Sequence, residues 1–146
     1  MRLAFELIAT LSATLFCGAS IYVNLVEHPA RMSCGTQIAA SVWAPSYKRA
    51  TVMQASLAIL GFLCGTAVWL LGGNAMWLAG AVFLGLVVPF TFIAIMPTNR
   101  RLEEPSRDRA SGETRTLLEK WGKLHAVRSV LSLVASVIYV GLLVGA

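Results

Sequence analysis

The sequence predicts an all-α fold: an integral membrane four-helix bundle with both termini on the non-cytoplasmic side and two long cytoplasmic loops. Hydrophobic residues make up 57% of the 146 residues and charged residues only 13%, whereas a soluble domain is about half apolar and about a quarter charged. Four apolar stretches are each near the ~20 residues that cross a bilayer as a helix. These observations exclude a soluble globular enzyme, a disordered tail and a disulfide-stapled secreted domain.

The four apolar stretches define the spans of a single transmembrane domain, residues 1–146. In lipid, each segment has to satisfy its own backbone polar groups, so we expect every stretch to be a helix. We interpret the first stretch as a retained span, because it lacks a clean signal-peptide cleavage site. In chain order the stretches lie at about residues 3–23, 53–71, 75–96 and 126–145.

The connections between the spans differ in length. The Gly-Gly-Asn segment at residues 72–74 is expected to join the second and third spans through a tight antiparallel turn. The other connections are long, at about residues 25–52 and 97–125, and the second one carries a dense mixture of acidic and basic residues. Such a mixture is typical of a solvated segment outside the membrane. Within the third span, Pro89 is expected to bend the helix.

The placement of the basic residues predicts the orientation. Of 12 lysines and arginines, only Arg2 lies on the side of the termini and of the Gly-Gly-Asn turn, and the other eleven lie in or beside the two long connections. Short loops rich in lysine and arginine stay in the cytoplasm. We therefore expect a multi-pass protein of the cell inner (cytoplasmic) membrane. The net charge of +5 is interpreted as this topology signal, and no nucleic-acid partner is predicted.

Polar residues near the membrane gather at the same expected cytoplasmic end. Trp121, His125 and Arg128 are spaced i, i+4 and i+7 and therefore share one helix face. Asn24 and His28 are also four residues apart, at the end of the first span. A bundle that collects such groups at one end can form a site. The candidate catalytic residues are His125, His28, Asn99, Trp121 and Arg128, and the candidate substrate-binding residues are Asn24, Glu27, Arg31, Trp43, Tyr47 and Arg100.

Each of these residues also has a structural interpretation. Arg128 could mark the cytoplasmic boundary with its long stem reaching the headgroups, and Trp121 could be an interface anchor. His28 and His125 with Glu27 would suit iron or zinc, and the two histidines alone could ligate haem. No local motif such as H-E-x-x-H supports a metal, so we predict no metal and no cofactor.

Small residues at helical spacing raise the question of self-association. Gly61 and Gly65 form a G-x-x-x-G pattern, which is common where membrane helices pack closely and is only weakly specific. A homo-oligomer is therefore one alternative and close packing inside one chain is the other.

The chain resembles the anthrone-oxygenase-like family of small integral membrane proteins, a group largely described as a domain of unknown function. The resemblance rests on four segments in a fixed order: N-L-V-E-H-P-A-R at residues 24–31, W-x-x-x-Y-K-R at 43–49, M-P-T-N-R-R-L at 96–102 and W-x-x-x-H-x-x-R at 121–128. A few fungal members of that family oxidise an anthrone to an anthraquinone with molecular oxygen and no known cofactor. Most bacterial members have no assigned activity, and this chain looks more like those.

Two functions remain as hypotheses. The resemblance implies a cofactor-independent oxygenase for an aromatic phenol, anthrone or quinol, in which His125 removes a proton and the other candidate catalytic residues orient the substrate or stabilise its charge. The alternative is a non-catalytic membrane protein that binds a lipid, a quinone or a protein partner through the same basic end. Both hypotheses place the chain in a lipid bilayer with a small hydrophobic aromatic or lipid-like ligand.

Overall fold

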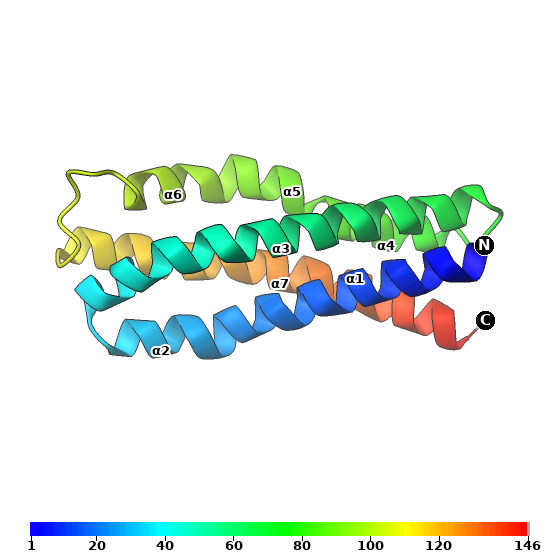
Figure 1. Cartoon of the computed structure of the whole chain (residues 1–146), viewed down its shortest axis with the longest axis horizontal. Helices are drawn as coiled ribbons and strands as arrows, with labels where there is room; N and C mark the ends of the chain where they lie inside the picture. The colour runs from blue at the N-terminus through cyan, green and yellow to red at the C-terminus, as the bar shows by residue number, and fades with distance from the viewer. Residues whose placement is uncertain (146) are drawn as a thin grey trace.

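The computed structural model describes residues 1–145, which form four long helical rods lying side by side (Figure 1). No strand occurs among these residues, so the predicted all-α class is confirmed. The first rod comprises α1 (Arg2–Tyr22), η1 (Val23–Glu27) and α2 (His28–Ser33), the second is α3 (Thr36–Leu70), the third comprises α4 (Met76–Gly85), α5 (Val87–Phe90), η2 (Thr91–Ile95) and α6 (Met96–Leu102), and the fourth is α7 (Gly112–Val144).

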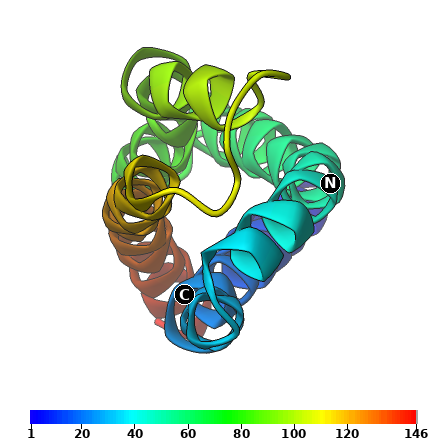
Figure 2. The ribbon, with the colours of Figure 1, turned by 90° about the vertical axis from the view of Figure 1, so that its left-hand side faces the viewer.

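Each of the four rods is long and apolar enough to cross a membrane. α1 packs against α3 and α7, and α4 packs against the same two helices, so the rods form a ring, which Figure 2 shows end-on. Large apolar side chains cover the outside: Leu15 is 61% exposed, Leu63 56% and Ile93 77%. An apolar outer surface of this kind requires lipid around it, so the chain is a multi-pass membrane bundle.

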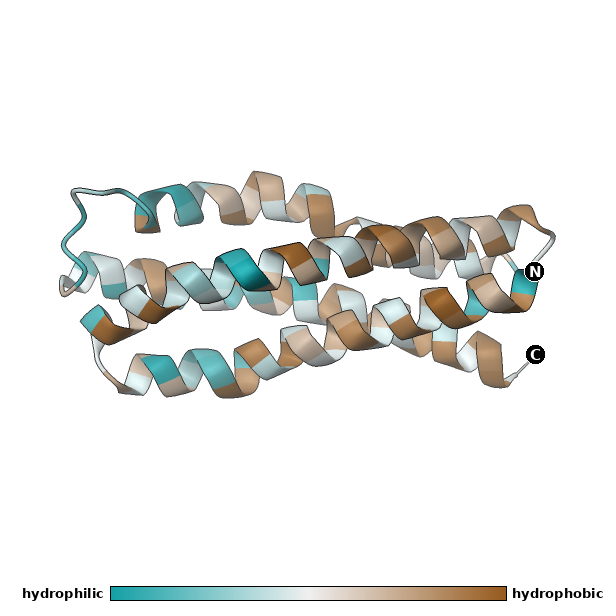
Figure 3. Ribbon diagram, viewed as in Figure 1, coloured by the Kyte–Doolittle hydropathy of each residue, from teal (hydrophilic) through white to brown (hydrophobic). Residues whose placement is uncertain are grey.

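The chain ends of α1 and α7 lie at one end of the bundle, and α2, α6 and the long loop lie at the other, which we call the distal end (Figure 1). Hydrophilic residues are concentrated toward the distal end (Figure 3). The assignment of the distal end to the cytoplasm stays a prediction from charge placement.

The helices continue well beyond the predicted spans. α3 has 35 residues, which is about 52 Å at 1.5 Å per residue, against a hydrocarbon core of about 30 Å. The connection expected at residues 25–52 is therefore almost wholly helical, with a break at Cys34 and Gly35, where Gly35 has a φ of 91°. Hydropathy predicts only the part of a helix that lies in the lipid. The hydrogen-bonded helix itself continues beyond the lipid, where its residues are polar.

The second long connection is shorter than expected for the same reason. α6 and α7 take up part of residues 97–125, and only residues 103–111 lie between them. Arg107 in this segment pairs with Glu104 at 3.4 Å and with Glu113 at 3.3 Å, and the Ser111 hydroxyl accepts a hydrogen bond from the Thr114 amide to cap α7. Ion pairs of Arg107 thus help to hold this loop, and a neutral serine side chain caps α7.

Two short π-helical segments precede prolines in the first and third rods. η1 ends directly before the His28-Pro29 pair, and η2 ends directly before the Met96-Pro97 pair. A proline lacks an N–H and its ring presses against the carbonyl four residues back, and a widened turn relieves this conflict. Both widened turns lie toward the distal end, where they set the direction of the side chains that follow.

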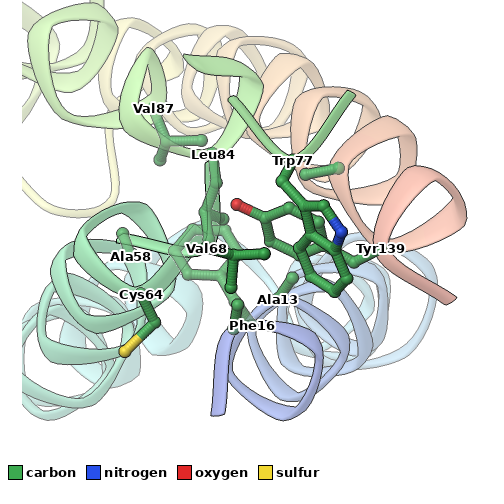
Figure 4. Packing of buried hydrophobic residues seen from close by; sticks show 11 residues of the cluster. Ala13, Phe16, Ala58, Cys64, Val68, Trp77, Leu84, Val87 and Tyr139 are labelled. Atoms are coloured by element: carbon green, nitrogen blue, oxygen red, sulfur yellow. The ribbon is translucent and has the colours of Figure 1, made fainter. Parts of the chain in front are cut away.

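The half of the bundle nearer the termini is an apolar core (Figure 4). Phe16, Leu84 and Tyr139 are fully buried there. A Cβ atom on Gly65 would overlap the Tyr139 hydroxyl, and one on Gly61 would overlap Leu84. The structure therefore uses the G-x-x-x-G spacing for close packing inside one chain, and self-association stays untested.

Candidate functional site

The distal half of the bundle encloses a small polar cavity that collects residues from three rods. Its volume is about 10 Å³, which is the lower limit for one water molecule. Arg31 comes from α2, Gln54 from α3, and His125 from α7. The complete lining is Val23, Arg31, Ser46, Tyr47, Ala50, Thr51, Gln54, Trp121, His125 and Arg128. We call this space the polar cavity.

Asn24 fixes the protonation pattern of His125. The Asn24 amide nitrogen donates to the Gly122 carbonyl at 2.9 Å, so the amide oxygen faces the opposite way and accepts from His125 Nδ1 and from the Ser129 hydroxyl, both at 2.7 Å. His125 Nδ1 therefore carries the proton. In the neutral ring this leaves Nε2 with a lone pair, and no hydrogen bond among the described residues uses Nε2.

The Asn24–His125 pair depends on the local structure of both rods. η1 is a widened turn, and its Asn24 reaches across to α7, about a hundred residues further along the chain. Gly122 leaves the α7 backbone without a side chain where the first rod packs against it. A Cβ atom there would lie 2.8 Å from the His28 ring, which is too close. Glycine at this position thus lets the first rod and its two polar side chains approach α7 closely.

Trp121 is the centre of an aromatic cluster at the cavity. Its ring centroid lies 5.2 Å from that of His28 and 4.9 Å from that of His125. Trp43 packs edge-on against it at 5.9 Å, and the Arg31 guanidinium carbon lies 5.4 Å from its centroid. The two histidines therefore pack against the same indole, and Trp121, only 2% exposed, is an interior residue rather than an interface anchor.

Arg128 also faces the interior of the bundle. Its side chain donates to the Gln54 side-chain oxygen at 2.7 Å, and its guanidinium carbon lies 5.5 Å from the centroid of the Phe16 ring. Arg128 is 5% exposed and Gln54 is 1% exposed. A guanidinium buried this deeply does not reach for the headgroups, so the boundary interpretation of Arg128 is wrong.

Glu27 joins the first rod to α3 through a hydrogen bond. The Glu27 carboxylate accepts from the Ser46 hydroxyl at 2.5 Å and lies 3.6 Å from Arg31. Tyr47, one residue further along α3, stacks on Trp43 with ring centroids 5.3 Å apart. Glu27 thus holds Arg31 in place beside the aromatic cluster.

Most of the unpaired buried polar atoms lie at this end. Native proteins pair the great majority of such atoms with protein groups or ordered water. Ten side-chain atoms in the described chain are buried without a hydrogen-bond partner. One of them, on Thr66, lies in the part of α3 nearer the termini. The other nine are His28 Nδ1, Arg31 Nε and Nη1, Trp43 Nε1, Gln54 Nε2, Asn99 Nδ2 and Oδ1, Trp121 Nε1 and Arg128 Nε. The distal end therefore holds most of the buried polar atoms of the described chain that have no hydrogen-bond partner.

The structure joins nine of the eleven candidate residues through side-chain contacts or the shared polar cavity. Asn99 is buried at the same end without a side-chain hydrogen bond, and Arg100 lies outside. Arg100 is exposed and lines none of the cavities in the described chain, although its neighbour Asn99 is fully buried. Consecutive residues of a helix point about 100° apart, so only one of the two can face the bundle. The structure therefore does not place Arg100 with the other candidates, and its role in substrate binding stays a prediction.

Three residues outside the list of candidates belong to the site: Gln54, Gly122 and Ser129. Gln54 stands out in the sequence as an amide at the start of an otherwise apolar span, and such residues usually face the bundle interior. Gly122 and Ser129 carry no comparable signal, because small residues are common throughout membrane helices.

The described residues contain no group of three or more histidine, cysteine, aspartate or glutamate side chains placed to hold a metal. His28 and His125 are separated by Trp121 in the packing described above. The absence of a cofactor from the reaction stays a prediction.

Fold and site together define a small multi-pass membrane protein with a buried, basic and aromatic site inside one end of a four-helix bundle. Residues 43–138 match the sequence model of the anthrone oxygenase family, so the chain belongs to this family. The matched range contains Trp43, Gln54, Trp121, His125 and Arg128.

Two fungal relatives are similar over nearly the whole chain. The anthrone oxygenase tpcL of Aspergillus fumigatus is 28% identical over 140 residues, covering 89% of this chain and 87% of that relative. An anthrone oxygenase of Claviceps purpurea is 26% identical over 147 residues, covering 90% of this chain and 84% of that relative. No solved structure matches the chain.

Proposed function

We propose that this protein is an oxygenase that uses molecular oxygen to oxidise an electron-rich aromatic compound of the anthrone type, without a cofactor. The observation that carries the proposal is the Asn24–His125 hydrogen bond of 2.7 Å, which leaves Nε2 of a buried histidine as a base beside unpaired cationic donors. Membership in the anthrone oxygenase family and the names of the two fungal relatives support the substrate class.

The chemistry begins with a proton transfer. Removing one proton from the methylene carbon of an anthrone gives an aromatic anion whose charge rests largely on oxygen. His125 Nε2 takes this proton as general base. The anion passes electrons to oxygen, and protonation gives a hydroperoxide at the former methylene carbon. Loss of the second hydrogen of that carbon as a proton, with cleavage of the O–O bond, forms the second carbonyl and releases water. One anthrone and one oxygen molecule thus give one anthraquinone and one water.

The unpaired donors supply the second part of the mechanism. Arg128 Nε, Gln54 Nε2 and Trp121 Nε1 are buried N–H groups without protein partners. Donors fixed in a site of low polarity stabilise a developing oxyanion much more than they would in water. In the proposed reaction they bind the oxygen of the aromatic anion and so favour the deprotonated substrate.

The test is oxygen uptake by the detergent-purified protein with 1,8-dihydroxyanthrone, corrected for the spontaneous oxidation of that compound. A general base contributes about 10²–10⁴-fold to the rate, so His125→Gln should reduce kcat at least 100-fold. Lys120→Gln is the matched control, because Lys120 is an exposed residue of the same helix and should leave the rate unchanged. Full turnover by His125→Gln would refute the proposed role of this residue.

The non-catalytic alternative makes a different prediction in the same assay. A protein that only binds a quinone or lipid at the polar cavity would consume no oxygen above the spontaneous rate. Quenching of Trp43 and Trp121 fluorescence by 1,8-dihydroxyanthraquinone would still reveal binding, since Trp121 lines the polar cavity and Trp43 packs against Trp121. Binding without oxygen uptake would therefore replace the oxygenase proposal with that alternative.

A further inference from the structure

A large apolar groove opens on the outer surface between α3 and the α4–α5 part of the third rod. Its volume is about 390 Å³. The rim faces the lipid, since Ile59 is 52% exposed and Val82 and Leu86 are each 45% exposed. The lining is Ala58, Ile59, Phe62, Val82, Gly85, Leu86, Val88 and Pro89. We call this feature the lipid-side groove.

The third rod is interrupted where the groove lies. α4 ends at Gly85 and α5 begins at Val87, two residues before Pro89; the predicted bend of this span stays a prediction. Proline removes one helical hydrogen bond and presses on the preceding turn. Gly85 adds no side chain to the wall, and a Cβ there would lie 2.8 Å from the Phe62 ring. Gly85 and Pro89 both line the groove, so the interruption of the rod lies in its wall.

A third space lies between the lipid-side groove and the polar cavity. An inner cavity of about 90 Å³ shares Ala58 and Val88 with the groove. At its other side it shares Tyr47, Thr51, Gln54 and Arg128 with the polar cavity. The three spaces are therefore neighbours that share walls, in a series that runs from the lipid surface to the buried hydrogen-bond donors.

The volumes of these three spaces indicate which of them can hold a ligand of several rings. Sites for small molecules usually occupy about 300–1,000 Å³. The polar cavity, at about 10 Å³, and the inner cavity, at about 90 Å³, are each too small for such a ring system, whereas the lipid-side groove is large enough. The groove is also apolar throughout, while the donors Gln54 and Arg128 lie at the inner end of the series.

We propose that the lipid-side groove is a lateral portal through which a flat, neutral aromatic ligand enters from the bilayer. On entry its rings occupy the groove, and its polar edge points through the inner cavity toward Gln54 and Arg128. The substrate class rests on the proposed function, but the route from the lipid is a property of the cavities alone.

The test measures access to a cysteine placed inside the series, at Thr51→Cys. The background protein carries Cys17→Ala, Cys34→Ser and Cys64→Ala, so that the new thiol is the sole one, and it is reconstituted in phosphatidylcholine vesicles. N-phenylmaleimide, which is flat, neutral and lipid-soluble, serves as the probe. A thiosulfonate reagent with a fixed positive charge serves as the water-borne comparison. We expect the neutral reagent to label the cysteine at least ten times faster than the charged one, relative to their rates with free cysteine.

Blocking variants identify the route. Ile59→Trp and Val88→Phe, on opposite walls of the groove, should each slow labelling by the neutral reagent at least ten-fold. Leu63→Trp and Ile93→Phe are the matched controls, because both residues are lipid-exposed on the same rods but outside the groove, and they should leave the labelling rate unchanged. Circular dichroism on each variant verifies that the fold is retained.

Equal labelling in the groove variants and the controls, or faster labelling by the charged reagent, would overturn the portal. Because no turnover is involved, the outcome is separate from the oxygen-uptake assay. Slower labelling in both groove variants without any oxygen uptake would support the portal and refute the oxygenase.

Discussion

Asn24 controls which nitrogen of His125 carries the proton, and its substitution by alanine tests this control directly. The change removes three hydrogen bonds: the one from His125 Nδ1 at 2.7 Å, the one from the Ser129 hydroxyl at 2.7 Å, and the one to the Gly122 carbonyl at 2.9 Å. His125 would then have no fixed acceptor at Nδ1, and both neutral tautomers would become populated.

The stability loss follows from these three bonds. Side-chain hydrogen bonds between membrane helices average about 0.6 kcal/mol, and ordinary protein hydrogen bonds contribute about 0.5–1.5 kcal/mol. Three bonds therefore predict a loss of about 2–4 kcal/mol in the free energy of unfolding for Asn24→Ala. Asn24→Asp retains an acceptor for His125 and Ser129 and loses only the bond to Gly122, so its loss should be smaller.

Two measurements follow the effect. Nitrogen-15 NMR of labelled histidine should show Nδ1–H for His125 in the native protein and in Asn24→Asp, and a mixture of tautomers in Asn24→Ala. In the oxygen-uptake assay Asn24→Ala should lower kcat at least ten-fold with little change in KM, because Asn24 lines neither the polar cavity nor the inner cavity. An Nε2–H tautomer in the native protein, or an unchanged tautomer ratio in Asn24→Ala, would refute the reasoning.

Three further predictions concern packing and topology. Gln54→Leu leaves the buried Arg128 guanidinium without its acceptor and should cost about 1.5–3 kcal/mol, measured by unfolding in mixed micelles. Gly65→Ala places a methyl group onto the Tyr139 hydroxyl and should cost about 1–3 kcal/mol by overpacking, measured as a lower Tm. Charge placement predicts that Asn74→Cys reacts with a membrane-impermeant maleimide added to intact cells.

Matched variants serve as the controls for these measurements. Gln54→Glu keeps an acceptor for the guanidinium and should be more stable than Gln54→Leu. Gly141→Ala adds a methyl group where no other atom lies within 4 Å, so its Tm should not fall. Cys34, an exposed thiol in the break near the distal end, should react only after the cells are permeabilised. Labelling of Cys34 but not of Asn74→Cys in intact cells would reverse the assigned orientation.

The sequence alone was sufficient for the class of fold and for the end of the bundle at which the candidate residues gather. Four apolar stretches require four spanning helices, because lipid offers no partners for backbone polar groups. The i, i+4 and i+7 spacing of Trp121, His125 and Arg128 places them on one helix face whatever surrounds that helix. Local patterns of this kind depend only on neighbours along the chain, so they can be deduced without a structure.

The tertiary structure alone decided which side chains meet and how. The Asn24–His125 bond joins residues 101 positions apart, and the Gln54–Arg128 bond joins residues 74 apart. Each depends on how far one rod is rotated and shifted against another, which the packing of small residues and the widened turns before Pro29 and Pro97 determine. The same rotation turns Arg100 outward, and the break before Pro89 opens the lipid-side groove. Hydropathy and spacing carry no information on these relations, because they describe each helix separately and the site lies between helices.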